Sequence, residues 1–397
     1  MKKVSFKSIN RINDKQIRFT CIDNIEGNID SYEFYYEFSE SNSPSDNALA
    51  ISFSCLIGKK QYDELYIDLD INYNILNEIQ KCNECAVTCR NVLNEFYSYE
   101  KKHSIIINFS GGLDSLALIN ILNKTKTHII SIDFGGSFAR EYNFFRTFNP
   151  IIVKTNIRES KFFKKLESKS WQFMGLGTVL YAEKLQSAYY TFGTILEADR
   201  NFNCNVTPSS LPFSALGLGY ISATNGLTEV ATTKIACNYH PDLIKDSLQS
   251  LSNVGTVKRF RKDLLASIFT NNIHINKVSN FQFGKDYVFD FLLFYFIKIF
   301  GFYFISNMIK GIPEDIQTIS STFKLNFYER MNPKTLITFN NYSICDSYLR
   351  CMFEAGISIY TKDDFYELYA IRNALSKHYH EENKHCLLYN YADSKRH

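Results

Sequence analysis

The feature that most constrains this chain is a short polar turn that reads Ser110-Gly111-Gly112-Leu113-Asp114-Ser115. The residues before it, 104–109, form a mainly apolar run that is typical of a buried parallel strand. Apolar residues then recur with helical spacing over residues 113–123. Adjacent glycines at such a junction let successive N–H groups point at one spot, and the positive end of the helix dipole adds attraction for an anion. The turn therefore predicts a phosphate-binding loop.

Strands and helices continue to alternate after this turn. A second strand is expected over residues 128–134, where it ends at Gly135 and Gly136, and a third over 150–154. A helix is expected over residues 177–190. Such alternation predicts an α/β fold with a doubly wound, Rossmann-like parallel sheet, which we assign to residues 96–245.

The flanking segments have different patterns. Residues 16–22 and 31–38 alternate like half-buried strands, a further strand is expected over 48–57, and residues 73–101 have a helical pattern. Residues 1–95 are therefore expected to form a small antiparallel β domain with a linking helix. From residue 246 to 397 the chain is expected to be mostly helical, as a substrate-binding or oligomerisation region.

Composition narrows the class of protein. A net charge of +3 argues against a dedicated nucleic-acid binder. The first residues lack the apolar run of a secretory signal, and ten unevenly spaced cysteines suggest reduced thiols, so a cytoplasmic location is expected. Charged residues interrupt the apolar stretch 288–309, which favours a buried helix pair, or an apolar surface covered by a partner subunit, over a membrane span.

The turn at residues 110–115 resembles the PP-loop of the ATP pyrophosphatases. That superfamily includes asparagine synthetase, argininosuccinate synthetase, GMP synthetase, tRNA lysidine and thiolation enzymes, and 7-cyano-7-deazaguanine synthase. The resemblance implies that ATP is cleaved between its α and β phosphates, with Mg²⁺ as cofactor and Asp114 as a ligand of the metal or an organiser of the loop. The Gly-Lys-Ser/Thr ending of a Walker A loop is absent, so transfer of the γ-phosphate is not favoured.

Two later motifs extend this resemblance. The stretch Asp133-Phe134-Gly135 resembles the Asp-Tyr-Gly-Gln element of 7-cyano-7-deazaguanine synthases, which implies that these three residues lie at the adenosine. Residues 193–199 resemble the Gly-x-x-x-x-Glu/Asp element near the substrate pocket, with Glu197 and Asp199 as its carboxylates. An ordinary strand end and a plain loop are the competing interpretations.

Adenylation builds charge on the pyrophosphate, so a cationic side chain is expected beside it. Lys234 and Arg261 are assigned to this role, and both join Asp114 as predicted catalytic residues. The same basic segment also offers Lys258, Arg259 and Lys262, and a solvated helix face is the alternative for any of them.

The cysteines do not predict a metal site. Cys345 and Cys351 resemble a damaged form of the C-terminal zinc motif of 7-cyano-7-deazaguanine synthases, in which Tyr348 stands where the middle cysteine would be. Two cysteines do not complete a tetrahedral zinc site, so zinc is not expected. Cys82, Cys85 and Cys89 have helical spacing and are expected to share one buried helix face.

Three functions are open at this point. The first is an AMP-forming, C–N bond-forming ligase that adenylates a carboxylate or amide. Ammonia or an amine is then the nucleophile, and the ammonia is either free or delivered by a partner protein. Its substrate could be a protein or a modified nucleobase in a bacterial defence or modification pathway. The second is a tRNA-modifying enzyme, for which only Cys204 and Cys237 are candidate thiolation cysteines. The third is a nucleotide-sensing module without turnover, and a homodimer is left open for all three.

Overall fold

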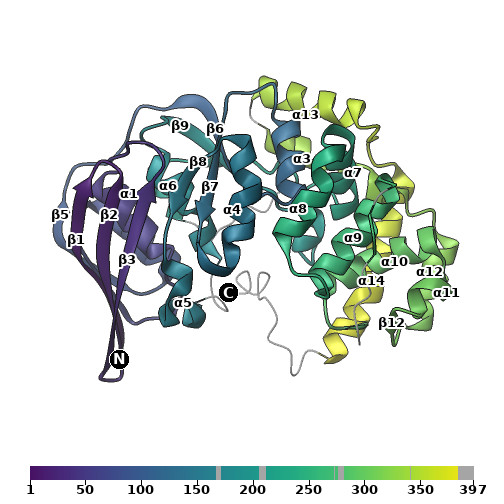
Figure 1. Ribbon diagram of the computed structural model, residues 1–397, viewed down its shortest axis with the longest axis horizontal. Helices are drawn as coiled ribbons and strands as arrows, with labels where there is room; N and C mark the ends of the chain where they lie inside the picture. Colours follow the sequence, from purple (N-terminus) through teal and green to yellow (C-terminus); the bar gives the residue numbers. More distant parts are fainter. Residues whose placement is uncertain (167–170, 205–211, 272, 276–280, 340, 383–397) are drawn as a thin grey trace. The chain divides into compact units, whose positions relative to one another are not determined.

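The structure is a computed structural model that describes residues 1–166, 171–204, 212–271, 273–275, 281–339 and 341–382 (Figure 1). Its contacts divide the chain into two compact units. Unit 1 comprises Met1–Ser110, Thr125–Phe192 and Thr207–Ile221, and unit 2 comprises Gly111–Lys124, Gly193–Val206 and Ser222–His397. Each unit has its own hydrophobic core. The sequence-based segments 1–95, 96–245 and 246–397 follow composition and stay a prediction, whereas these units are grouped by contacts and are discontinuous.

Unit 1 contains one ten-stranded, mostly parallel sheet with the order β10-β9-β6-β7-β8-β3-β2-β1-β4-β5. Its strands are β1 Lys2–Asn13, β2 Gln16–Ile25, β3 Asn28–Phe38, β4 Glu64–Asn72, β5 Ala86–Leu93, β6 Lys102–Asn108, β7 Thr127–Asp133, β8 Ile151–Lys154, β9 Ser187–Phe192 and β10 Gly219–Tyr220. The strands expected over residues 104–109, 128–134 and 150–154 are thus confirmed.

The strand order at one end of this sheet positions the turn. Counted in chain order from β6, the neighbours β8-β7-β6-β9-β10 are the third, second, first, fourth and fifth strands, all parallel. This order is compatible with a Rossmann-like fold, in which the order reverses between the first and fourth strands. Ligands of open α/β sheets bind beyond the carboxyl ends of the strands at such a reversal. The segments that begin there are residues 109–112 after β6 and residues 193–195 after β9.

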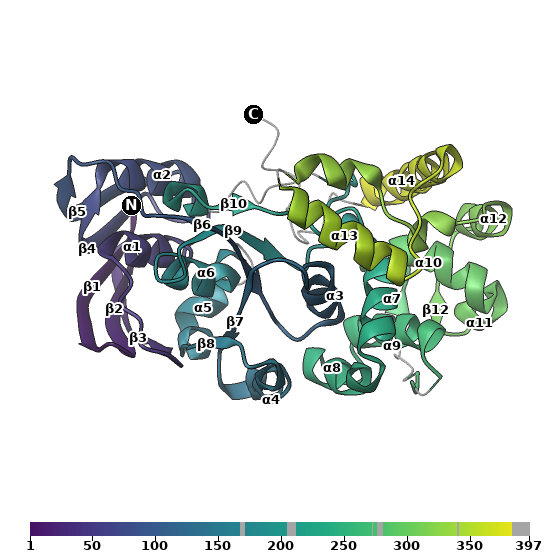
Figure 2. The same cartoon turned by 90° about the horizontal axis from the view of Figure 1, so that it is seen from above.

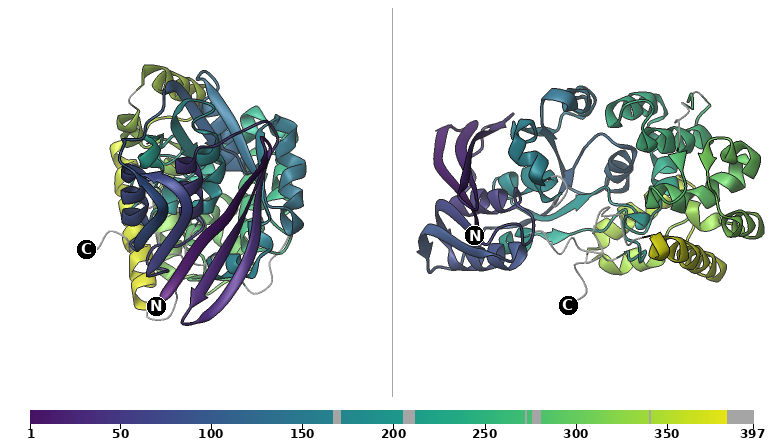
Figure 3. Two further views of the ribbon diagram at one scale, coloured as in Figure 1. Left: turned by 90° about the vertical axis from the view of Figure 1, so that its left-hand side faces the viewer. Right: turned by 90° about the horizontal axis from the view of Figure 1, so that it is seen from below.

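The first three strands are antiparallel, as predicted, whereas β4 pairs in parallel with β1 and β5 in parallel with β4, and all five strands extend the main sheet. β2 pairs with both β1 and β3, and β3 joins β8 through the pair Phe38↔Val153 (purple strands in Figure 3). Their inward side chains enter the same core as the parallel strands. The small N-terminal β domain is therefore shown only in part, because its strand β3 pairs with β8 and its strands share one sheet with the parallel strands.

Three expected elements of unit 1 are corrected. Residues 48–57, expected as a strand, belong mainly to helix α1 (Asp46–Ser54), which begins at the cap Ser45 and is buried all round. A helix without a polar face has no amphipathic period, so its sequence resembles that of a buried strand. The helix expected over 73–101 ends early, as α2 (Tyr73–Asn83), because Glu84 has φ 50° and β5 follows. The one expected over 177–190 is α6 (Leu176–Tyr181) followed by β9. Helices α4 (Ala139–Phe145) and α5 (Lys161–Leu166) complete the unit.

Unit 2 is mostly helical, as predicted for the C-terminal region. Helices α3, α7, α8 and α9 pack against one another (Figures 1 and 2). Its helices are α3 Leu113–Ile121, α7 Glu229–Tyr239, α8 Ile244–Leu251, α9 Val257–Phe269, α10 Tyr287–Phe300, α11 Phe302–Ser306, α12 Glu314–Thr322, α13 Tyr342–Glu354 and α14 Lys362–Glu382, with the short strands β11 Phe281–Gln282 and β12 Ile309–Lys310.

The apolar stretch 288–309 forms α10 and α11, which are separated at Gly301 with φ 85°. Two helices are therefore present as expected, but only α10 is mostly buried in the core of unit 2, because α11 leaves Tyr303 81% exposed and Phe304 38% exposed. Across the residues that the structure describes, no helix combines the length and apolar character needed to cross a membrane.

Candidate phosphate-binding site

The turn after β6 opens helix α3 without a side-chain cap. Gly111 has φ 80°, a conformation that residues with a Cβ rarely adopt, and Gly112 is the N-cap of α3. Ser247 of α8 donates a hydrogen bond of 2.7 Å to the carbonyl oxygen of Gly111 and so holds the turn from outside. The first amides of a helix have no intrahelical acceptor, and Gly112 has no side chain to supply one. This end of α3 therefore presents N–H groups that can donate hydrogen bonds to an anion.

The segment that follows β9 packs directly on this turn. A Cβ added to Gly193 would lie 2.9 Å from both the carbonyl carbon of Asp114 and the backbone nitrogen of Ser115. Real Cβ atoms essentially never approach backbone so closely, so only glycine fits at position 193 without displacing the first turn of α3. The hydroxyl of Ser115 is already engaged, because it donates to the Gly112 carbonyl at 2.8 Å.

Asp114 is the point where the turn meets the rest of unit 2. Its Oδ1 accepts a hydrogen bond of 2.6 Å from the hydroxyl of Thr232 on α7, and its Oδ2 accepts one of 2.8 Å from Lys262 Nζ on α9. The Asp114 side chain keeps 21% of its surface exposed, whereas that of Lys262 keeps 3%. Helices far apart in sequence thus bring a buried ammonium to the first turn of α3.

Lys262 belongs to a buried network of alternating charges. Its Nζ also lies 2.5 Å from Glu229 Oε1, and Glu229 Oε2 lies 2.8 Å from Arg261 Nε as an ion pair. That last contact lacks hydrogen-bond alignment. Arg261 Nη1 in turn lies 3.3 Å from Asp286 Oδ1 at the more exposed end of the network.

The network keeps its members charged. Burial alone would raise the pKa of Glu229, but Arg261 and Lys262 outweigh it and lower that pKa below its ordinary value. For Lys262, burial would lower the pKa, but Asp114 and Glu229 raise it, so the ammonium persists at neutral pH. Lys262 has three N–H donors, and these two carboxylates take two of them. Among the described residues, the third donor has no acceptor in the structure.

Glu197 is a buried carboxyl that contacts the backbone of Glu229, a member of this network. It lies in the 3-10 helix η5 (Leu196–Ala198), keeps 1% of its surface exposed, and its Oε1 accepts the backbone N–H of Glu229 at 2.8 Å. Burial raises its pKa most, and the nearby charge of Glu229 raises it further, to about 8. Glu197 is therefore mostly protonated at neutral pH.

The predicted cationic residues separate into two places. Arg261 lies in the network, but Lys234 points elsewhere, because its Nζ pairs with Glu329 at 3.0 Å and with the Gly356 carbonyl at 3.3 Å. The structure brings Lys262, which was only one of several candidates, into contact with Asp114.

Comparison with protein-family models, with curated proteins and with solved structures gave no match.

Asp133, Phe134 and Gly135, predicted at the adenosine, lie in unit 1. Asp133 Oδ1 accepts the N–H of Gly135 at 2.9 Å, and Gly135 has φ 64°. The ring of Phe134 is buried, with its centroid 5.7 Å from that of Phe173 and 4.9 Å from the Arg158 guanidinium carbon. Its ring therefore has no open face for a base, and only the backbone of this strand end is left to contact a ligand.

The cysteines are dispersed. Cys345 and Cys351 lie on α13, where Tyr348 between them is fully buried. Among the described residues, no group of three or more histidine, cysteine or acidic side chains could hold a metal ion. Cys82 lies near the end of α2, Cys85 lies between α2 and β5, and Cys89 lies on β5. The prediction that these three cysteines share one helix face is therefore wrong.

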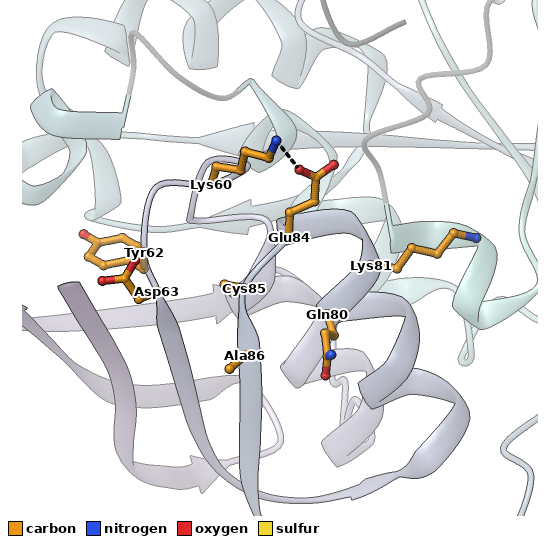
Figure 4. Close-up of a pocket in the computed structure, with 8 residues that line it drawn as sticks. All are labelled: Lys60, Tyr62, Asp63, Gln80, Lys81, Glu84, Cys85 and Ala86. Carbon is orange, nitrogen blue, oxygen red and sulfur yellow. Dashed lines mark ion pairs between the residues drawn. The ribbon is translucent and has the colours of Figure 1, made fainter. Parts of the chain in front are cut away.

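A surface hollow of about 660 Å³ lies elsewhere, in unit 1 (Figure 4). Lys60 and Glu84 form an ion pair of 3.1 Å at its edge, and Lys59 pairs with the same glutamate at 2.6 Å. None of the residues predicted to bind ATP lines it. The hollow therefore does not enlarge the candidate site.

Proposed function

We propose that this chain is an ATP pyrophosphatase of the PP-loop type, which splits ATP into AMP and pyrophosphate at the turn of residues 110–115. The single observation that carries the proposal is the contact between Lys262 Nζ and Asp114 Oδ2, across 148 positions of sequence. A glycine turn before a helix is common, but a buried cation held at its first turn is what a polyphosphate site needs. The Rossmann-compatible strand order, with the turn following the first strand at the reversal, supports the same proposal.

In this proposal, phosphate oxygens accept hydrogen bonds from the first N–H groups of α3 and from the remaining N–H of Lys262. Arg261 acts indirectly, because it neutralises part of the negative charge of Glu229. The ammonium of Lys262 can then interact with the ligand as well. Lys234, bound to Glu329, has no part in it. The adenosine contacts predicted for Asp133, Phe134 and Gly135 stay a prediction.

The residues present fit Mg²⁺ in the manner usual for nucleotide sites. Mg²⁺ commonly takes one or two carboxylates and completes its octahedron with phosphate oxygens and water. Asp114 is partly exposed, and each of its oxygens accepts one hydrogen bond, which leaves a lone pair on each for the ion. The ion would supply the positive charge that this site lacks, because three carboxylates (Asp114, Glu229 and Asp286) face two cations (Lys262 and Arg261).

The reaction class follows from the bond that breaks. A carboxylate or amide oxygen of the acceptor attacks the α-phosphorus of ATP, the bond between that phosphorus and the bridging oxygen breaks, and pyrophosphate leaves with the electron pair. Ammonia or an amine then displaces AMP from the acyl adenylate. The site contributes positioning and neutralises the charge that grows on pyrophosphate. The acceptor and the nitrogen source are not specified by the described residues.

A thiolating tRNA enzyme is less well supported. Cys204 and Cys237, the candidate cysteines, are buried, and burial raises the pKa of Cys204 to about 11 and that of Cys237 to about 12. Thiolates are the nucleophilic form of cysteine, and neither side chain would form one readily at neutral pH.

The test is to incubate the full chain with Mg²⁺, ATP labelled at the α-phosphate and candidate carboxylates with ammonia, and to separate the nucleotides. AMP with pyrophosphate is expected, and ADP with phosphate would refute the proposal. Lys262→Met should reduce AMP formation at least 100-fold, whereas Lys262→Arg should retain more, since it keeps the charge. Lys234→Met is the matched control and should stay within about twofold of wild type, because α7 directs that side chain to Glu329. ATP binding without AMP on any acceptor would favour a nucleotide-sensing module instead.

A further inference from the structure

Glu197 has one carboxyl oxygen with a structural partner and one without. Its Oε1 accepts the N–H of Glu229, the first residue of α7, at 2.8 Å. Its Oε2 is fully buried and has no hydrogen-bond partner among the described residues. A buried polar atom without a partner is costly, and such atoms are rare in folded proteins. Oε2 is therefore an atom whose partner is to be sought in a ligand.

The position of Glu197 points to the ligand of the phosphate site. Gly193, four residues earlier, packs on the backbone of Asp114 and Ser115 in the first turn of α3. Glu197 also lies within electrostatic reach of Asp114 itself and of Arg261. The same short segment thus supplies the close contact with the turn and the buried carboxyl beside it.

The titratable groups that interact electrostatically with Glu197 come from several elements of unit 2. Acidic groups are Glu229 on α7 and Asp114 on α3, and the cation is Arg261 on α9. Neutral hydroxyls come from three tyrosines, namely Tyr287 of α10, Tyr328 of η8 (Asn326–Glu329) and Tyr360. Burial and the charge of Glu229 raise the pKa of Glu197 to about 8, so an O–H donor is available at neutral pH.

We propose that Glu197 binds the nucleotide directly, by donating a hydrogen bond from its protonated carboxyl to a phosphoryl oxygen. This inference rests on the proposed function and adds a specificity residue to it. A neutral acid is the appropriate group here, because the carboxylates around the two cations already match or exceed their charge. An ionised Glu197 would have no proton to donate and would repel the phosphate. Nucleotide binding is therefore coupled to the retention of one proton.

The coupling predicts a specific pH dependence. Near pH 8 about half of the free protein carries the ionised carboxyl, so binding takes up roughly half a proton, and above pH 8 the apparent affinity falls by up to about tenfold per pH unit. Calorimetric titration of the full chain with Mg-ATP between pH 6.5 and 9.5 measures the fall. Repetition in two buffers of different ionisation enthalpy measures the proton uptake on the unaltered protein.

Two variants isolate the carboxyl. Glu197→Gln keeps an acceptor for the Glu229 N–H and places an amide donor where the O–H was, so it should bind Mg-ATP within about threefold of wild type at pH 7 and lose the decline above pH 8. Glu197→Met removes both groups, so it should bind about tenfold more weakly than wild type at pH 7 and should also lose the decline above pH 8. The titration of ATP itself is common to all three proteins and cancels in the comparison.

The outcomes separate the two proposals. Absence of Mg-ATP binding to the wild-type protein at every pH would refute the proposed function, and this inference with it. Binding whose pH profile is the same in wild type and Glu197→Gln, or binding without proton uptake near pH 8, would overturn the role of Glu197 alone. A pH effect that appears only when an acceptor carboxylate is added would also overturn it, because the carboxyl would then face the acceptor and not the phosphate.

Discussion

Replacement of Lys262 by methionine is the sharpest test of the buried network. The substitution preserves most of the aliphatic volume and removes the ammonium that both Asp114 and Glu229 contact. Breaking a buried ion pair by removing one partner typically costs about 3–5 kcal/mol, because a charge is left without compensation. Here Glu229 retains Arg261 and Asp114 is 21% exposed, so the lower end, about 3 kcal/mol, is expected.

Chemical denaturation can measure this cost in unit 2. The sole tryptophan, Trp171, lies in unit 1, so its fluorescence reports that unit, whereas circular dichroism at 222 nm is dominated by the helices, most of which lie in unit 2. We expect the dichroism transition of Lys262→Met to move to lower urea and the fluorescence transition to move less. Lys234→Met is the matched control, because its ion pair with Glu329 is about a quarter to a third exposed and such pairs contribute about 0–1 kcal/mol.

A second substitution shows where the cost comes from. In the double variant Lys262→Met with Asp114→Asn, the carboxylate whose ion-pair partner was Lys262 is also neutralised, whereas Glu229 keeps Arg261, and about half of the lost stability should return. The pH window follows from the pKa directions. The lowered pKa of Glu229 gives stability that is present above its ordinary pKa and is lost as pH falls through the folded value. The raised pKa of Lys262 gives stability that is lost only as pH rises through its folded value. A cost for Lys262→Met no larger than that of the control at pH 7 would refute the buried network.

Three further predictions concern the turn and its surroundings. Gly193→Ala should cost about 1–3 kcal/mol and weaken Mg-ATP binding, because its Cβ would lie 2.9 Å from the backbone of Asp114 and Ser115; unchanged affinity by calorimetry would contradict the packing. Gly111→Ala should cost about 1–2 kcal/mol in urea denaturation, because φ 80° strains any residue with a Cβ, and no change would mean that the turn relaxes freely. AMP formation should depend on Mg²⁺ and cease with a chelator, and persistence without divalent cations would contradict the charge balance of the site.

The parallel part of the fold could be predicted from sequence because short apolar runs followed by glycines mark its first strands. The strand β6 contains three consecutive isoleucines and β7 two, and a glycine follows the end of each strand within three residues. Those features need no knowledge of the tertiary structure. Helix α1 was mistaken for a strand because every residue from Asn47 to Ser54 is buried, so its sequence has no polar face to reveal a helical period. The joining of the N-terminal strands to β8 was also out of reach, since it depends on a pair of edge strands more than a hundred residues apart.

The structure explains why Lys234 is not the cation at Asp114. Lys234 lies two residues after Thr232 on α7, which is about 200° around the helix, so both side chains cannot face Asp114. Arg261 and Lys262 are neighbours on α9, where the run from Arg259 to Ala266 is buried. Sequence shows that a basic pair is present but not that the pair is enclosed, because burial is set by helices that come from distant parts of the chain. The choice between the two depends on which carboxylate each one meets.

The charge balance links the two proposals. With Asp114, Glu229 and Asp286 set against Lys262 and Arg261, the protein offers no excess positive charge to a polyphosphate. Two conditions then have to hold for ATP to bind: Mg²⁺ must accompany the nucleotide, and no further carboxylate beside the site may ionise. Glu197 is the group that decides the second condition, because its pKa of about 8 lies just above neutral pH. If the wild type binds ATP only when Mg²⁺ is present, and if Glu197→Gln binds Mg-ATP at pH 9 as the wild type does at pH 7, both conditions hold at one site.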